Sequence, residues 1–92
     1  MTQEQRELEQ TLCHLLGGPL PEHATEHINQ ALQVAGLLEQ RGFEFRLLDA
    51  RPKDPEATLW KALFSKGDRL FQCEHSDAAL AVCTAAARAL AR

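Results

Sequence analysis

Residues Ser76–Leu90 read SDAALAVCTAAARAL, and this segment limits the possible folds more than any other part of the chain. Ser76 is a residue type that caps helix N-termini, Asp77 adds negative charge there, and Arg88 and Arg92 lie at the opposite end, so the charges match the helix dipole. The alanines let a helix backbone approach a sheet closely. The segment therefore predicts a closing helix that packs on a sheet, with an apolar line formed by Leu80, Cys83, Ala87 and Leu90.

Three segments ahead of this helix alternate apolar and polar residues, as half-buried strands do. They are 43–49, 58–64 and 69–74, and the last two are joined by a turn in which Gly67 can adopt a positive φ. We expect the closing helix and a second helix to cover the apolar face of this sheet. That face consists of Phe43, Phe45, Leu47, Trp60, Ala62, Phe64, Phe71 and Cys73.

Two more helices are predicted ahead of the strands. The first follows a capping-box-like pair, Thr2 and Gln5, and the second begins at Pro21 and ends before Gly42. Their apolar stripes are Leu8, Leu12, Leu15 and Leu16 in the first helix, and Ala24, Ile28, Ala31, Leu32, Ala35 and Leu38 in the second. The sequence thus predicts an α+β fold of order α-α-β-β-β-α in one domain, 1–92, with an N-terminal helix (1–18) and an αβββα core (20–92).

The second face of the predicted sheet carries more leucine than a fully hydrated surface needs. We expect the first helix to cover it, which would give helix, sheet and helix layers in an α/β/α-type sandwich. The alternative is that this face joins Leu8, Leu12 and Leu15 in a partner or homodimer interface. The leucines of this face are Leu48, Leu59, Leu63 and Leu70, and they lie among Glu44, Arg46, Lys61, Gln72 and Glu74.

Composition narrows the classes of function. Lys and Arg number 10 against 13 Asp and Glu, a net charge of −3, so nucleic acid is an unlikely partner. The sequence has no apolar run of membrane-spanning length and no secretory signal at its start, and its three cysteines imply no disulfide framework. We therefore expect a cytoplasmic protein without a membrane anchor.

The candidate reactive residues form no recognisable catalytic or metal-binding set. His23 and His27 are four residues apart, but no third ligand is apparent, so we expect no metal. Cys13 cannot easily use the adjacent His14 as a base, and Cys83 lies on the apolar line of the closing helix. No phosphate-binding glycine loop is present. We expect no cofactor and no enzymatic activity.

The order helix, three strands, helix is similar in outline to the double-stranded RNA-binding domain. That family needs basic residues at the start of its last helix to reach phosphates. Here the corresponding positions are Asp77, Ala78, Ala79 and Leu80. The resemblance therefore extends to topology and much less to RNA binding.

A second resemblance covers nearly the whole chain. The first helix runs from Arg6-Glu7-Leu8 to Leu16-Gly17, and the later motifs are Gly42-Phe43-Glu44-Phe45, Trp60-Lys61-Ala62-Leu63-Phe64, Leu80-Ala81-Val82-Cys83 and Ala85-Ala86-Ala87-Arg88-Ala89-Leu90. In order and spacing they resemble the phage ABA sandwich domain family. The resemblance implies a phage or prophage protein and supplies no catalytic residues.

We therefore expect a non-enzymatic phage-type protein that binds and inhibits a host protein or ribonucleoprotein complex, most concretely an anti-CRISPR protein. Alternatives are a nucleic-acid-binding module and a structural homodimer. The predicted partner-binding residues lie on the second sheet face and the loop after the first strand: Glu44, Arg46, Asp49, Arg51, Lys53, Asp54, Glu56 and Lys61.

Overall fold

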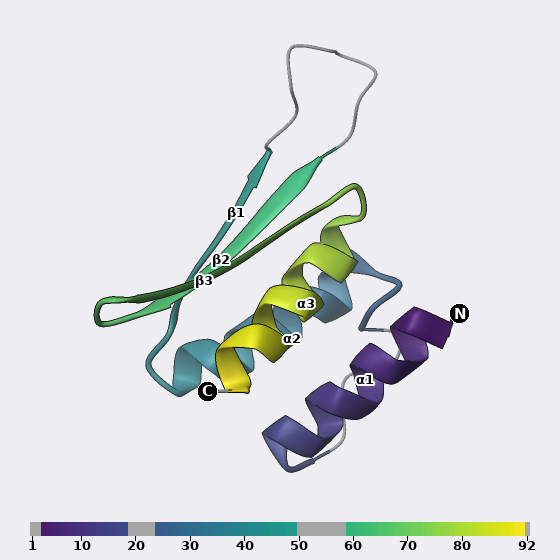
Figure 1. The fold of residues 1–92 in the computed structure, drawn as a ribbon, viewed down its shortest axis with the longest axis horizontal. Helices are drawn as coiled ribbons and strands as arrows, with labels where there is room; N and C mark the ends of the chain where they lie inside the picture. The colour runs from purple at the N-terminus through teal and green to yellow at the C-terminus, as the bar shows by residue number, and fades with distance from the viewer. Residues whose placement is uncertain (1–2, 19–23, 50–58, 92) are drawn as a thin grey trace.

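The structure, a computed structural model, describes residues 3–18, 24–49 and 59–91. Within these residues, three strands form one antiparallel sheet in the order β1-β2-β3, and three helices accompany it (Figure 1). The elements are α1 (Gln3–Leu16), α2 (Ile28–Gln40), β1 (Glu44–Asp49), β2 (Trp60–Lys66), β3 (Arg69–His75) and α3 (Ala78–Leu90). The predicted α+β fold and its element order are confirmed.

One face of the sheet forms the core with α2 and α3. Its aromatic row runs across the three strands as Phe45, Phe64 and Phe71, because these residues pair in register. β2 and β3 meet through a two-residue turn at Gly67–Asp68, where Gly67 has a φ of 62°. α3 packs on β2 and β3 while α2 packs on β1, so the two predicted helices do cover the apolar face.

α3 is buried on nearly every side, which explains its alanine content. Its buried residues are Ala79, Ala81, Val82, Cys83, Ala85, Ala86, Ala87 and Ala89. A helix that is apolar all round needs cover on more than one face. The sheet covers one side of α3, α2 packs beside it, and α1 covers the remaining side.

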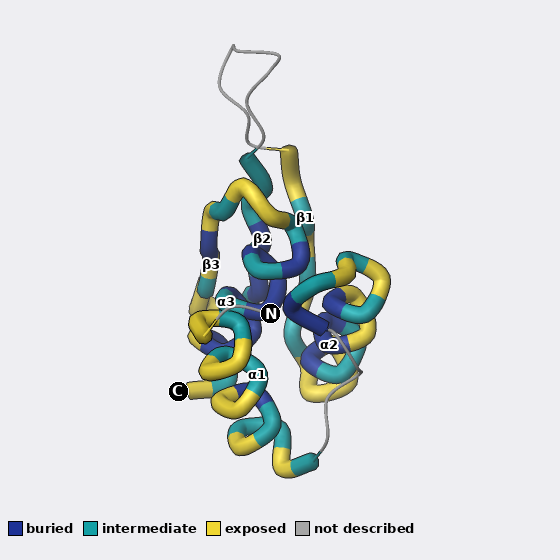
Figure 2. Tube along the Cα trace, turned by 90° about the vertical axis from the view of Figure 1, so that its right-hand side faces the viewer, coloured by how far each residue is buried: buried dark blue, intermediate teal, exposed yellow. Residues whose placement is uncertain are grey.

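The position of α1 therefore differs from the predicted helix, sheet and helix layering. α1 lies on the side of α3 away from the sheet, so the layers are sheet, then α2 with α3, then α1 (Figures 1 and 2). Leu12 is fully buried there. Polar contacts at the turn before α2 also hold α1: Thr25 Oγ1 donates to Glu9 Oε1 at 2.9 Å, and Gln5 Nε2 donates to the Thr25 carbonyl at 3.2 Å.

α2 begins at Ile28 and not at Pro21, with His27 as the N-cap residue. Residues 24–26 form a turn whose buried Thr25 is bonded to α1, so these residues do not continue the helix. The buried stripe of α2 is Ala31, Val34, Ala35 and Leu38, whereas Leu32 is 41% exposed. The predicted stripe was thus wrong at Leu32. Thr2, Pro21 and His23 lie outside the described residues.

The cap of α3 also differs from the prediction. Asp77, and not Ser76, is the N-cap residue: its backbone is extended, and its Oδ1 accepts a hydrogen bond from the Leu80 amide at 3.2 Å. The Asp77 amide in turn donates to His75 Nδ1 at 2.9 Å.

None of the helices described here has the length and apolar character that crossing a membrane requires.

Candidate functional site

The sheet face opposite α2 and α3 is the candidate site, and we call it the open face. Strand pairing arranges its residues in three rows across β1, β2 and β3. All the helices that the structure describes lie on the other side of the sheet (Figures 1 and 2). The rows are Glu44, Ser65, Leu70; then Arg46, Leu63, Gln72; then Leu48, Lys61, Glu74.

A line of leucines crosses this face from corner to corner. Leu48 on β1, Leu63 on β2 and Leu70 on β3 lie on successive strands, and each is displaced by one row from the leucine on the strand before it. We call them the leucine diagonal. Leu48 is 47% exposed and Leu70 is 57% exposed, while Leu63 in the centre is half-buried. Apolar surface left exposed in a contiguous line on a sheet marks an interaction surface more often than isolated exposed leucines do.

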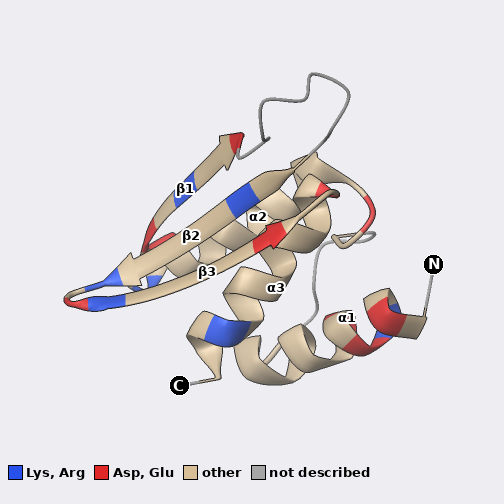
Figure 3. Cartoon of the chain, turned by 45° about the horizontal axis from the view of Figure 1, so that its top comes forward, with Lys and Arg blue, Asp and Glu red and all other residues tan. Residues whose placement is uncertain are grey.

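Four charged side chains border the leucine diagonal, two on each side. Arg46 and Glu44 lie on one side, and Lys61 and Glu74 lie on the other, so cations and carboxylates balance. Figure 3 shows these charges distributed over all three strands. Within the described ranges, none of the four makes a hydrogen bond or an ion pair. Their charges are therefore available to a partner that covers the leucines.

The predicted site residues divide into three groups. Glu44, Arg46 and Lys61 lie together on the open face. Asp49 pairs with Trp60, in the alternating set of strand residues that faces the helices, so it does not belong to the open face. The remaining four, Arg51, Lys53, Asp54 and Glu56, lie outside the described residues. The prediction did not include Glu74 as a binding residue. Strand alternation was a sufficient signal, because it places Cys73 on the core face and therefore Glu74 on the open face.

The buried thiol on α3 is chemically quiet. Burial, followed by the negative charges of Glu9 and Asp77, raises the pKa of Cys83 from its ordinary 9.0 to about 12. Its Sγ lies 3.4 Å from the Ala24 carbonyl, to which the thiol donates. A thiol that stays protonated is a poor nucleophile. Cys83 therefore joins α3 to the turn before α2 and suits no catalytic role.

Metal ligands do not cluster in the part of the chain that the structure describes. No group of three or more His, Cys, Asp or Glu side chains comes together there. His27 precedes α2, and His23, four residues before it in the sequence, lies outside the described ranges. The open face thus remains the candidate site that the geometry supports.

Comparisons of the chain with protein-family models, with curated proteins and with solved structures return no match.

Proposed function

We propose that this chain is a non-enzymatic binding protein that covers a surface of a partner protein with its open face. The observation that supports the proposal is the leucine diagonal, exposed on a sheet whose other face is covered by α2 and α3. Full burial of an exposed leucine is worth roughly 1.5–3 kcal/mol, and because these leucines are already partly buried, a partner surface would gain about half of that or less for each, before the costs of association.

A second copy of the chain is the alternative occupant of the open face. The leucine diagonal is bordered by two cations and two carboxylates, so a second copy would bring like charges as well as opposite charges together across the interface. We favour a partner of different sequence, whose charges can complement all four.

Nucleic acid also fits the open face poorly. Its two cations, Arg46 and Lys61, are balanced by Glu44 and Glu74, so the face presents no positive strip to a phosphate backbone. At the start of α3, Asp77 caps the helix and places a carboxylate where an RNA-binding domain would need a cation. The charge pattern therefore favours a protein surface.

The narrower proposal is inhibition of a bacterial defence complex, with CRISPR interference as the concrete case. It rests on the resemblance to the phage ABA sandwich domain family, and it places the protein in the host cytoplasm. A small rigid sheet face that covers a functional surface of the complex would act by occlusion and would need no catalytic group.

A plaque assay tests this proposal. Host strains with active CRISPR immunity express the chain and are infected by the targeted phage, while matched strains without immunity serve as controls. We expect plaques to be restored in an immune host and to be unchanged in the non-immune host. Absence of restoration across hosts that carry different CRISPR types would contradict the narrower proposal.

A further inference from the structure

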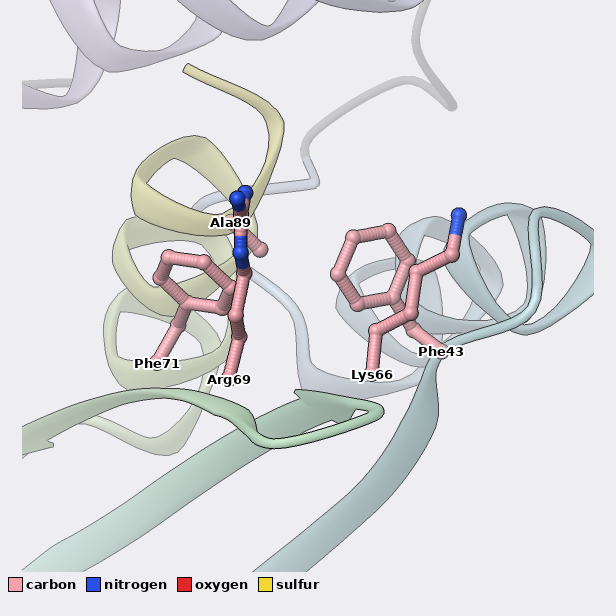
Figure 4. A pocket seen from close by; sticks show the side chains of 5 residues that line it. All are labelled: Phe43, Lys66, Arg69, Phe71 and Ala89. Carbon is pink, nitrogen blue, oxygen red and sulfur yellow. The ribbon is translucent and has the colours of Figure 1, made fainter. Parts of the chain in front are cut away.

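A cavity of about 300 Å³ lies between the β2–β3 hairpin and the C-terminal end of α3, on the opposite side of the sheet from the open face. We call it the hairpin pocket, and its volume is at the lower end of the range for small-molecule sites. Figure 4 shows Arg69 and Phe71 on one side of the pocket, and Lys66 and Phe43 on the other. The lining residues are Phe43, Lys66, Arg69, Phe71 and Ala89.

The walls of the pocket are apolar, and they are held in place by packing on other side chains. The Phe43 and Phe71 rings lie edge to face, with centroids 6.4 Å apart, and the Phe43 ring also packs edge to face on Phe64 at 6.5 Å. Ala89, buried on α3, completes the apolar lining. Phe43 and Phe71 are partly buried and pack against the core, so this aromatic corner is already formed before a ligand arrives.

Two cations border this apolar setting, one at each end of a single turn. Lys66 and Arg69 are paired residues on either side of Gly67–Asp68, and like charges directly opposite each other on two strands are destabilising. Both side chains rise from the hairpin, Arg69 toward the end of α3 and Lys66 past the Phe43 ring toward the Arg41 carbonyl at the end of α2 (Figure 4). The Lys66 ammonium is turned toward the Arg41 carbonyl, so the charge of Arg69 is the one that an anion in the pocket would meet directly.

The two cations differ in how they are held. Lys66 Nζ donates to the Arg41 carbonyl at 3.1 Å and lies 5.3 Å from the centre of the Phe43 ring. Arg69 makes neither a hydrogen bond nor an ion pair to any residue that the structure describes. Its planar guanidinium is therefore available to hold a carboxylate through two parallel hydrogen bonds, while Lys66 supplies fixed positive charge.

The helix end favours a monoanion over a phosphate dianion. Ala89 belongs to the last turn of α3, where the partial negative charge of the helix dipole is located. Phosphate sites commonly use the opposite, N-terminal end of a helix. A carboxylate brings less negative charge than a phosphate dianion to the C-terminal end of α3. Its two oxygens also match the two parallel N–H groups of the Arg69 guanidinium.

We propose that the hairpin pocket binds a small carboxylate with an apolar body, whose carboxylate pairs with Arg69 beside Lys66 and whose apolar part packs on Phe43, Phe71 and Ala89. This site is independent of the open face and of the function proposed for it.

Phenylacetate is a suitable probe, with phenylacetamide as its neutral match. Titration into the isotope-labelled full chain, followed by nuclear magnetic resonance, should give saturable shifts at Phe43, Lys66, Arg69 and Phe71 with a dissociation constant on the order of 1 mM, as befits a fragment-sized ligand. Phenylacetamide should bind about tenfold more weakly. Equal shifts with the two probes, or no saturable shift at these residues, would overturn the proposal.

Two variants with the same charge change separate the pocket from general electrostatics. Arg69→Gln should weaken phenylacetate binding about tenfold or more, whereas Arg46→Gln on the open face should leave it unchanged. Both side chains are exposed, so both variants should fold, which their backbone spectra verify. An equal loss in the two variants would overturn the role of Arg69, and tighter binding of phenyl phosphate than of phenylacetate would overturn the assignment to a carboxylate.

Discussion

Cys83 shows how burial turns a reactive residue into a structural one. The side chain is fully buried on α3, its pKa is raised to about 12, and its thiol donates to the Ala24 carbonyl. Burial disfavours the thiolate because the charged form loses its hydration. The thiol therefore contributes to packing between α3 and the turn before α2, as the sequence pattern predicted for the apolar line of this helix.

The raised pKa of Cys83 predicts a loss of stability at alkaline pH. Above pH 9, the unfolded chain loses the thiol proton while the folded chain retains it up to about pH 12, so rising pH favours unfolding across this window. The contribution is at most about 1.4 kcal/mol per pH unit. Urea unfolding of the wild type and Cys83→Ala between pH 8 and pH 11 measures the difference in slope. Parallel curves for the two proteins would contradict this reading.

Asp77 and Ser76 give a matched pair for the cap of α3. Asp77 accepts the hydrogen bond from the Leu80 amide, so Asp77→Ala should lower the free energy of unfolding by about 1 kcal/mol. Ser76→Ala should change it by less than about 0.5 kcal/mol, because Ser76 is exposed and is not the N-cap residue. Denaturant unfolding checks both. A larger loss at Ser76 would place the cap one residue earlier.

The sequence identifies the region of this cap but not the residue. Ser and Asp are both favoured N-cap types, and they are adjacent here. The choice depends on which residue has the extended backbone and on the contact of the Asp77 amide with His75, which is set by the end of β3. This information belongs to the tertiary structure.

At the level of whole elements, α1 depends on α3 for its position. The leucine stripe of α1 was predictable from spacing, and Leu12 is its fully buried member. Its packing partner was not predictable, because both the second sheet face and α3 offered apolar surface. The structure places it on α3, which is apolar on nearly all sides, and Thr25 adds the polar contact with Glu9.

Leu12→Ala should therefore destabilise the whole protein and not merely release α1. Removing the buried side chain should lower the free energy of unfolding by about 2–5 kcal/mol. Leu32→Ala on α2 is the control, with an expected loss below about 1 kcal/mol since Leu32 is 41% exposed. Calorimetry or urea unfolding measures both. Equal losses would show that α1 does not belong to the core.

At the scale of the whole molecule, this layering makes the two faces of the sheet different, because the described helices cover one face and leave the other open. Because all described helices gather on one side of the sheet, the other side keeps its leucines exposed. Alternation along the strands predicted which residues share this face, and the register then revealed the leucine diagonal, which spacing alone could not supply. The hairpin pocket was likewise invisible in the sequence, since its residues come from separate segments.

We propose that the open face carries the binding function. The most direct test repeats the plaque assay with the double variant Leu48→Asp/Leu70→Asp, in which charge replaces the two exposed ends of the leucine diagonal. Leu32→Asp, an exposed leucine on α2, is the matched control. With all three proteins folded and equally expressed, we predict that the wild type and Leu32→Asp restore plaques and the double variant does not; restoration by the double variant would contradict the claim.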